Sequence, residues 1–285
     1  MIKNQLKTVL LLGLLTSIFL VIGAFFGGKT GLLIGLLFAL GMNFVSYWWS
    51  AKIVLWMYKA KEADTKEYAH LYTIVKEIAH TAGLPMPKVY IVETPQSNAF
   101  ATGRNPEHAV VAVTTGILQL LTKEELRGVL AHEMGHIKNR DILISTIAAT
   151  IAGVISYVAM IARWGAIFGG LGKDGERGNG LLELIVLGII APLMAMIIQL
   201  AISRSREYLA DETGAKLVKD PHALASALEK IEKNVAHHPF QAVGSTQATA
   251  HLFISNPFKG GAWLSMFSTH PKITERCRRL REMKI

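Results

Sequence analysis

Four long apolar runs divide this chain into alternating hydrophobic and polar parts. They cover residues 9–26, 31–49, 142–161 and 184–202. Each run is close to the ~20 residues that a helix needs to cross the hydrocarbon core of a bilayer. The short breaks within each pair predict two membrane hairpins, residues 1–49 and 142–202, and therefore four transmembrane helices. A signal peptide is the alternative for the first run, and core helices of a soluble domain are the alternative for the last two.

The segments outside the hairpins, residues 50–141 and 203–285, have the mixed pattern of one water-facing domain split by the second hairpin. Helical and alternating patterns predict helices over 65–82, around Glu207, over 223–235 and after Pro271, and strands over 88–92 and 109–114. Residues 103–106 are expected to form a turn that joins the segment 98–102 to the second strand. The pattern therefore predicts a mainly α fold with a small β-sheet.

One predicted helix carries the most informative motif of the chain. Thr122 and Glu125 have the T-x-x-E spacing of a capping box that starts this helix. His132 and His136 then lie one turn apart on one face, where two imidazoles can reach one metal ion, and Glu133 lies beside them. This motif predicts a catalytic zinc site in which Glu133 is the general base that deprotonates a zinc-activated water. A surface helix with two solvated histidines is the alternative.

The third zinc ligand is predicted from the position of the second hairpin. A catalytic zinc usually has three protein ligands and one water. The hairpin returns the chain to the same membrane face, with His136 six residues before it and Glu207 five residues after it. We therefore expect Glu207 to be the third ligand, and Asp211, one turn later, to accept the other N–H of a ligating histidine. The alternative is a solvated helix on which Glu207 pairs with Arg204 or Arg206.

Composition and charge favour a membrane protein. Of the 285 residues, 51% are hydrophobic and 18% charged, and the mean hydropathy is +0.34, which is more apolar than an ordinary soluble domain. Lys and Arg gather before the first and third runs and after the second and fourth, so both termini and the zinc helix are expected in the cytoplasm. The net charge of +9 is expected to lie near anionic lipid, and no nucleic-acid-binding motif accompanies it.

Two further sequence features limit the function. The single cysteine, Cys277, excludes an intramolecular disulfide, which fits a reducing compartment. Gly23–Thr30 matches the phosphate-binding pattern G-x-x-x-x-G-K-T, but it lies at the turn of a membrane hairpin rather than between a strand and a helix, so no ATP is expected as a partner. The glycines at every fourth position from Gly23 to Gly35 predict close packing of the hairpin helices.

Several motifs together resemble one protease family. Glu207–Asp211, taken with His132–His136, resembles the E-x-x-x-D signature of HtpX-type integral-membrane zinc metalloproteases. These are membrane gluzincins, related to the CAAX prenyl endoproteases. The resemblance includes Asn98–Gly103, Ser268–Pro271 and Glu275–Arg276 and runs along nearly the whole chain. It implies four transmembrane helices plus a split cytoplasmic gluzincin-type zinc protease domain that holds one zinc ion.

The resemblance also implies roles for residues outside the zinc helix. Asn98, Ala99 and Phe100 are expected to bind an extended peptide substrate at a strand edge; an ordinary hairpin that covers the site is the alternative. His270 is expected to act in catalysis by stabilising the oxyanion, with Arg276 close by in support of the site. A histidine at a helix start and a structural arginine are the alternative.

These features predict a zinc-dependent endopeptidase. It is expected to be a multi-pass protein of the cell (inner) membrane with its active site in the cytoplasm. Its partners are the lipid bilayer and polypeptide substrates. By the resemblance, those substrates are misfolded or damaged membrane proteins, cut in a stress response. The alternatives are a site-specific processing protease for one membrane-associated substrate and a non-enzymatic scaffold with structural zinc. The single cysteine disfavours the scaffold, because structural zinc sites are filled mostly by Cys and His.

Overall fold

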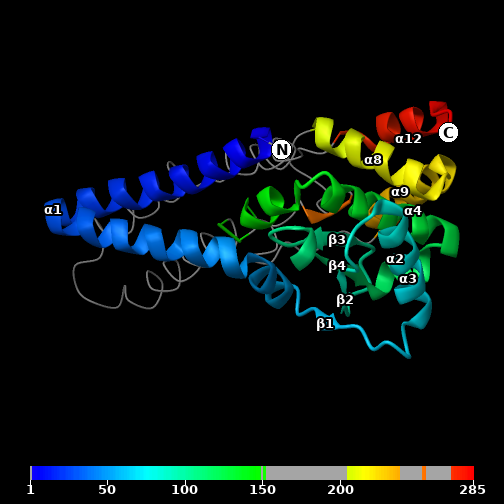
Figure 1. The fold of residues 1–285 in the computed structure, drawn as a ribbon, viewed down its shortest axis with the longest axis horizontal. Helices are drawn as coiled ribbons and strands as arrows, with labels where there is room; N and C mark the ends of the chain where they lie inside the picture. The colour runs from blue at the N-terminus through cyan, green and yellow to red at the C-terminus, as the bar shows by residue number, and fades with distance from the viewer. Residues whose placement is uncertain (1, 149, 152–203, 238–251, 255–270) are drawn as a thin grey trace.

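The structure consists of a long helical hairpin and a domain of helices packed around a small sheet (Figure 1). This computed structural model describes residues 2–148, 150–151, 204–237, 252–254 and 271–285. Most of the predicted third span and all of the predicted fourth span lie outside these residues. Residues 142–148 are helical, and Ile144 and Ile147 pack against Leu15 of the hairpin. The start of the third apolar run therefore contacts the first.

The hairpin is formed by α1 (Ile2–Met57), which is two helices joined at Gly27 and Gly28. Gly28 has a φ of 55°, a conformation that glycine adopts without steric cost. The two arms approach closely at Gly23, Gly31 and Gly35, where a Cβ would overlap the backbone of the opposite arm. The predicted close packing is thus confirmed for three of the four glycines, while Gly27 belongs to the turn.

Among the described residues, one helix, Gly27–Met57, is long and apolar enough to cross a membrane. The first arm contains a shorter apolar stretch, Leu12–Val21. Large apolar side chains such as Leu37 and Phe38 on the second arm are exposed, as expected of a helix in contact with lipid. The prediction of four transmembrane helices is therefore not confirmed as a whole.

A four-stranded sheet with the order β1-β2-β4-β3 forms one layer of the domain. The strands are β1 (Lys61–Glu62), β2 (Lys88–Val92), β3 (Ala99–Thr102) and β4 (Val110–Thr114). β2 and β4 are parallel, whereas β1 and β3 run antiparallel to their neighbours. The predicted strands and the turn after residue 102 are confirmed, and the turn continues into the short helix η1 (Pro106–His108). β3 lies at an edge of the sheet, which is where it meets the candidate site.

Most helices of the domain agree with the predicted ones to within a few residues, but the sequence patterns did not predict α3 (Thr115–Leu120). They are α2 (Ala69–Ala82), α3 (Thr115–Leu120), α4 (Lys123–Lys138), α8 (Arg204–Val218), α9 (Pro221–His237) and α12 (Ile273–Glu282). α2 begins four residues later than predicted. The carboxylate of Asp64 accepts hydrogen bonds from the N–H groups of Lys66 and Glu67, and these hold a turn in place of the first helical turn.

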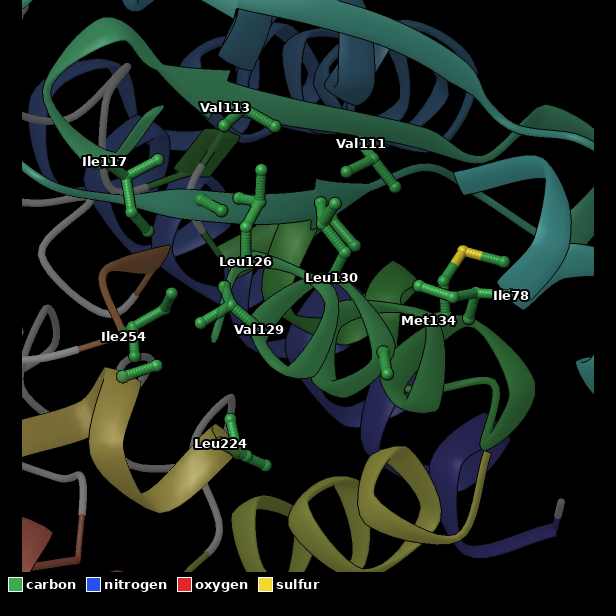
Figure 2. Close-up of a cluster of buried hydrophobic side chains, with 14 of the residues drawn as sticks. Ile78, Val111, Val113, Ile117, Leu126, Val129, Leu130, Met134, Leu224 and Ile254 are labelled. Atoms are coloured by element: carbon green, nitrogen blue, oxygen red, sulfur yellow. The ribbon is translucent and has the colours of Figure 1, made fainter. Parts of the chain in front are cut away.

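Helix α4 lies at the centre of the domain, between the sheet and helices α8 and α9. Figure 2 shows Leu126 and Leu130 of α4 next to Val113 and Val111 of β4, with Leu224 of α9 on the other side. Leu126 and Leu130 lie four residues apart on one face of α4, and this apolar stripe forms the contact of the helix with the sheet. Because both sides of α4 are covered, His132 and Glu133 are buried, while His136 is partly exposed.

Candidate metal centre

The start of α4 is held by the predicted capping box. The Thr122 hydroxyl accepts a hydrogen bond from the Glu125 N–H at 3.3 Å, and the Glu125 carboxylate accepts one from the Thr122 N–H at 2.9 Å. Glu125 also accepts hydrogen bonds from Ser226 and Lys230 of α9, at 2.6 and 2.7 Å. One carboxylate therefore caps α4 and ties it to α9.

Two glycines bring α8 against the motif residues of α4. A Cβ on Gly214 of α8 would lie 2.7 Å from the backbone nitrogen of His132. A Cβ on Gly135 of α4 would lie 2.9 Å from the carbonyl oxygen of Ala210. Only residues without a side chain allow two helices to approach this closely. The close approach places Glu207, at the start of α8, beside His132 and His136.

Three predicted ligands converge at this crossing. The Nε2 atoms of His132 and His136 are 3.2 Å apart, and the two rings are nearly perpendicular, at 86°. The carboxylate oxygens of Glu207 lie 3.7 Å from Nε2 of His136 and 3.9 Å from Nε2 of His132. One ligating atom from each residue lies within 4.8 Å of the others. Glu207 is only 7% exposed, which excludes the alternative of a solvated helix face.

The chemistry of this donor set fits a zinc ion. Nδ1 of His132 lies 2.9 Å from Asp211, and Nδ1 of His136 lies 3.2 Å from Asp141. When Nδ1–H donates to a carboxylate, a neutral imidazole presents its lone pair at Nε2, and the two Nε2 atoms face each other. Tetrahedral zinc with bonds of ~2.0–2.1 Å to nitrogen separates two such atoms by ~3.3–3.4 Å. The separation of 3.2 Å is close to that value.

Asp141 is the residue of this site that the sequence reasoning missed. Arg140 has a φ of 55° and turns the chain at the end of α4, so that the N–H of Asp141 donates to the carbonyl of His136. Burial alone would lower the pKa of His136, but the charge of Asp141 and its hydrogen bond raise that pKa to about 10. A metal ion that binds the imidazole of His136 therefore displaces a proton from it. The available signal was a carboxylate five residues after His136.

Asp211 and Arg276 form a buried pair behind His132. Arg276 donates from Nε and Nη2 to the two oxygens of Asp211, at 2.8 and 2.6 Å, and lies 3.6 Å from Glu207. Burial would raise the pKa of Asp211, but the Arg276 guanidinium lowers it to about 2. Asp211 thus stays ionised and accepts the N–H of His132. Arg276 reaches Asp211 from α12 and is fully buried.

Glu133 points toward the edge strand β3. One of its carboxylate oxygens accepts a hydrogen bond from the backbone N–H of Ala101 at 2.8 Å. Burial raises the pKa of Glu133, although the neighbouring histidines oppose the shift. A buried carboxylate with a raised pKa, beside a metal-ligand set, has the properties of a general base.

The residues expected to bind substrate lie along β3, and most of their side chains are occupied. Ala99 and Phe100 are buried. The side chain of Asn98 accepts a hydrogen bond from the N–H of Ile254 at 3.1 Å. Substrate binding by Asn98, Ala99 and Phe100 remains a prediction, and the main chain of β3 is the part of this edge that can pair with an extended peptide. The remaining predicted site residue, His270, lies outside the described residues.

Comparisons with known proteins find relatives along nearly the whole chain. Residues 65–284 match Peptidase family M48. The chain is 55% identical to a Protease HtpX homolog of Persephonella marina, covering 98% of this chain and 97% of that protein. It is 54% identical to a Protease HtpX homolog of Thermodesulfovibrio yellowstonii, covering 98% of both chains. The crystal structure of S. mikatae Ste24p has the same fold, with a TM-score of 0.50 and 18% identity over 98% of this chain and 66% of that one.

Proposed function

The chain belongs to peptidase family M48, and on this premise we propose how its buried site hydrolyses a peptide bond and which substrates reach it. The predicted HtpX-type resemblance is confirmed by the family match and by relatives over nearly the full length. The protein is accordingly a zinc-dependent metalloendopeptidase of the membrane. The residue roles and the biological role below are our proposals.

The ligand set that we assign to the zinc ion is His132, His136 and Glu207. A bound zinc ion supplies a Lewis acid that polarises the scissile carbonyl and acidifies a water molecule. Asp211 and Asp141 accept the Nδ1–H of the two imidazoles and orient Nε2 of each ring toward the position of the ion. The observation that carries the assignment is the convergence of three ligating atoms within 4.8 Å, from residues up to 75 positions apart.

Glu133 is the general base in this proposal. It takes a proton from the attacking water and then transfers it to the nitrogen of the leaving amine. Its hydrogen bond to the N–H of Ala101 keeps the carboxylate between the ligand set and β3. A substrate strand that lies along β3 would therefore present its scissile bond to the carboxylate. Main-chain recognition of this kind tolerates many side chains.

The biological role that we propose is quality control of misfolded or damaged membrane proteins. In this proposal the enzyme is a multi-pass protein of the inner membrane and cuts its substrates on the cytoplasmic side. The sequence-tolerant edge strand and the apolar hairpin beside the catalytic domain support this role. The competing role is site-specific processing of one membrane-associated substrate. Cleavage of a panel of unrelated membrane proteins separates the two, since quality control requires that several are cut and processing requires that one is.

The catalytic proposal is tested with the full-length protein in detergent. Wild type and Glu133→Gln are compared for zinc content and for cleavage of casein. The variant keeps the size of the side chain and an oxygen that accepts the Ala101 N–H, but it lacks the basic carboxylate. We expect one zinc per chain in both proteins and cleavage by the wild type alone. A Glu133→Gln protein that cleaves at the wild-type rate would show that Glu133 is not the base.

A further inference from the structure

A cavity lies between the hairpin and the catalytic domain, away from the metal centre. Its volume is about 520 Å³, and residues of the second arm of α1, of β2 and of the turn after β3 line it. It shares no lining residue with the ligand set of the metal centre. Pockets of a few hundred Å³ commonly hold small ligands, and the mechanism proposed above makes no use of this one.

The cavity lies at the level where the second arm of α1 is expected to leave the membrane. The apolar run from residue 31 to residue 49 spans ~28 Å as a helix, close to the ~30 Å of a hydrocarbon core. Tyr47, Trp48 and Trp49 lie at its domain-side end and line the cavity, with exposures of 37%, 48% and 46%. Exposed tyrosine and tryptophan at this position are typical of the membrane–water interface.

Positive charge lines the same cavity from three elements. Lys52 lies one turn beyond Trp48 on α1, Lys88 begins β2, and Arg104 lies in the turn after β3. One lining carboxylate, Glu107, opposes them, and Lys88 also lies 3.8 Å from Glu62. The lining therefore has an excess of cations and favours an anionic ligand.

Arg104 is held in place for such a ligand. Its guanidinium lies over the Trp48 ring, 4.4 Å from the ring centroid. It donates to Nε2 of His108 at 2.7 Å, and Nδ1 of His108 is in turn 2.7 Å from the side-chain oxygen of Asn105. Within the part of the chain that the structure describes, no carboxylate pairs with Arg104. The remaining N–H groups of this fork suit a phosphate.

We propose that this cavity binds the phosphate headgroup of an anionic membrane phospholipid. The phosphate lies between Arg104 and Lys52, and the aromatic residues contact the glycerol and the first acyl carbons. Phe44 lines the cavity and Leu40 lies one turn further toward the membrane; both are exposed, and together they offer an acyl chain an apolar path along α1. A free inorganic anion would make no contact with that apolar path. The lipid thus holds the catalytic domain against the bilayer, whatever the role of Glu133.

The test is lipid retention by the full-length protein, measured by native mass spectrometry. The detergent-purified protein is exchanged into mixed micelles that contain phosphatidylglycerol or phosphatidylcholine. We expect the wild type to retain phosphatidylglycerol in preference to phosphatidylcholine. Arg104→Gln and Lys52→Gln should each weaken this binding about five-fold, because one charge at a membrane surface contributes on that scale. Lys76→Gln, an equal loss of charge on the exposed face of α2, is the control and should bind as the wild type does.

Three results would overturn the proposal. Equal retention of both lipids would remove the role of charge, and wild-type binding by both variants would place the lipid elsewhere. Competition by inorganic phosphate at the concentration of the lipid would make the ligand a free anion. The zinc content of each variant reports folding. Because Lys52 is exposed on α1, its variant still decides the outcome if Arg104→Gln misfolds.

Discussion

Gly214 of α8 lies directly against the backbone of His132 in α4. A Cβ at position 214 would be 2.7 Å from the His132 nitrogen and 2.8 Å from the His132 Cα. No side chain fits there unless the two helices separate. Since α8 carries Glu207, this contact sets the distance between the third ligand and the two histidines.

We therefore expect Gly214→Ala to separate α4 from α8. Overpacking of this kind typically costs about 1–3 kcal/mol, and the displaced Glu207 should weaken zinc binding as well. Thermal unfolding and zinc content measure the two effects. Gly41→Ala is the matched control, because a Cβ at Gly41 would contact nothing within 4 Å. Equal melting temperatures and equal zinc content for the two variants would contradict the predicted close approach.

Asp141→Asn should weaken zinc binding while leaving the fold intact. The carboxylate accepts the Nδ1–H of His136, and loss of such a partner typically costs 10–100-fold in metal affinity or activity. Competition with a chromogenic chelator measures the affinity. Glu212→Gln removes an exposed carboxylate of α8 and should change nothing. If Asp141→Asn kept the wild-type affinity, Asp141 would have no part in orienting His136.

Arg276→Met should destabilise the domain far more than Arg278→Met on the same helix. Arg276 is fully buried and pairs with Asp211, and loss of one partner of a buried pair typically costs about 3–5 kcal/mol. Arg278 pairs with Glu275 and Glu282 in solvent, where ion pairs contribute little to stability. Thermal unfolding compares the two.

Adding Asp211→Asn to Arg276→Met should recover part of the lost stability, since the unpaired charge is then gone. Similar melting temperatures for the two single variants would mean that the buried pair contributes no more than the exposed one.

The stability of the domain should depend on pH because of Glu125, at the start of α4. Burial raises the pKa of Glu125, but hydrogen bonds from Lys230, Ser226 and the Thr122 N–H bring the net pKa below its ordinary value of 4.5. Because the folded-state pKa is the lower one, the stabilisation is complete above pH 4.5 and is lost as the pH falls through the folded-state pKa. Glu125→Gln should thus melt lower than the wild type near neutral pH, and the gap should close in acid.

The comparison of wild type with Glu125→Gln cancels the other groups that titrate in this range. Glu124→Gln is the control, because Glu124 is exposed on the same turn of α4. A gap in melting temperature that stays constant from neutral to acid pH would show that the charge of Glu125 does not stabilise the contact between α4 and α9.

The sequence by itself determined the main elements of this protein, although it did not predict β1 and α3. The capping box at Thr122, the apolar stripe of α4, the strands at 88–92 and 110–114 and the glycine-lined hairpin all follow from patterns within one segment. Such patterns predict well because backbone hydrogen bonding and side-chain periodicity act between near neighbours. The spacing of His132 and His136 is a local pattern of this kind. The spacing that places Glu207 and Asp211 on one face of α8 is another.

Only the tertiary structure decided which groups surround the ligand set. Asp141 reaches His136 because the left-handed residue Arg140 turns the chain, and Arg276 reaches Asp211 because α12 packs on α8 and α9. The side chain of Asn98 accepts a hydrogen bond from the backbone N–H of Ile254, which lies 156 positions further along the chain. These partners are distant in sequence or depend on one backbone angle. Their choice follows from the packing of whole helices, which no local pattern encodes.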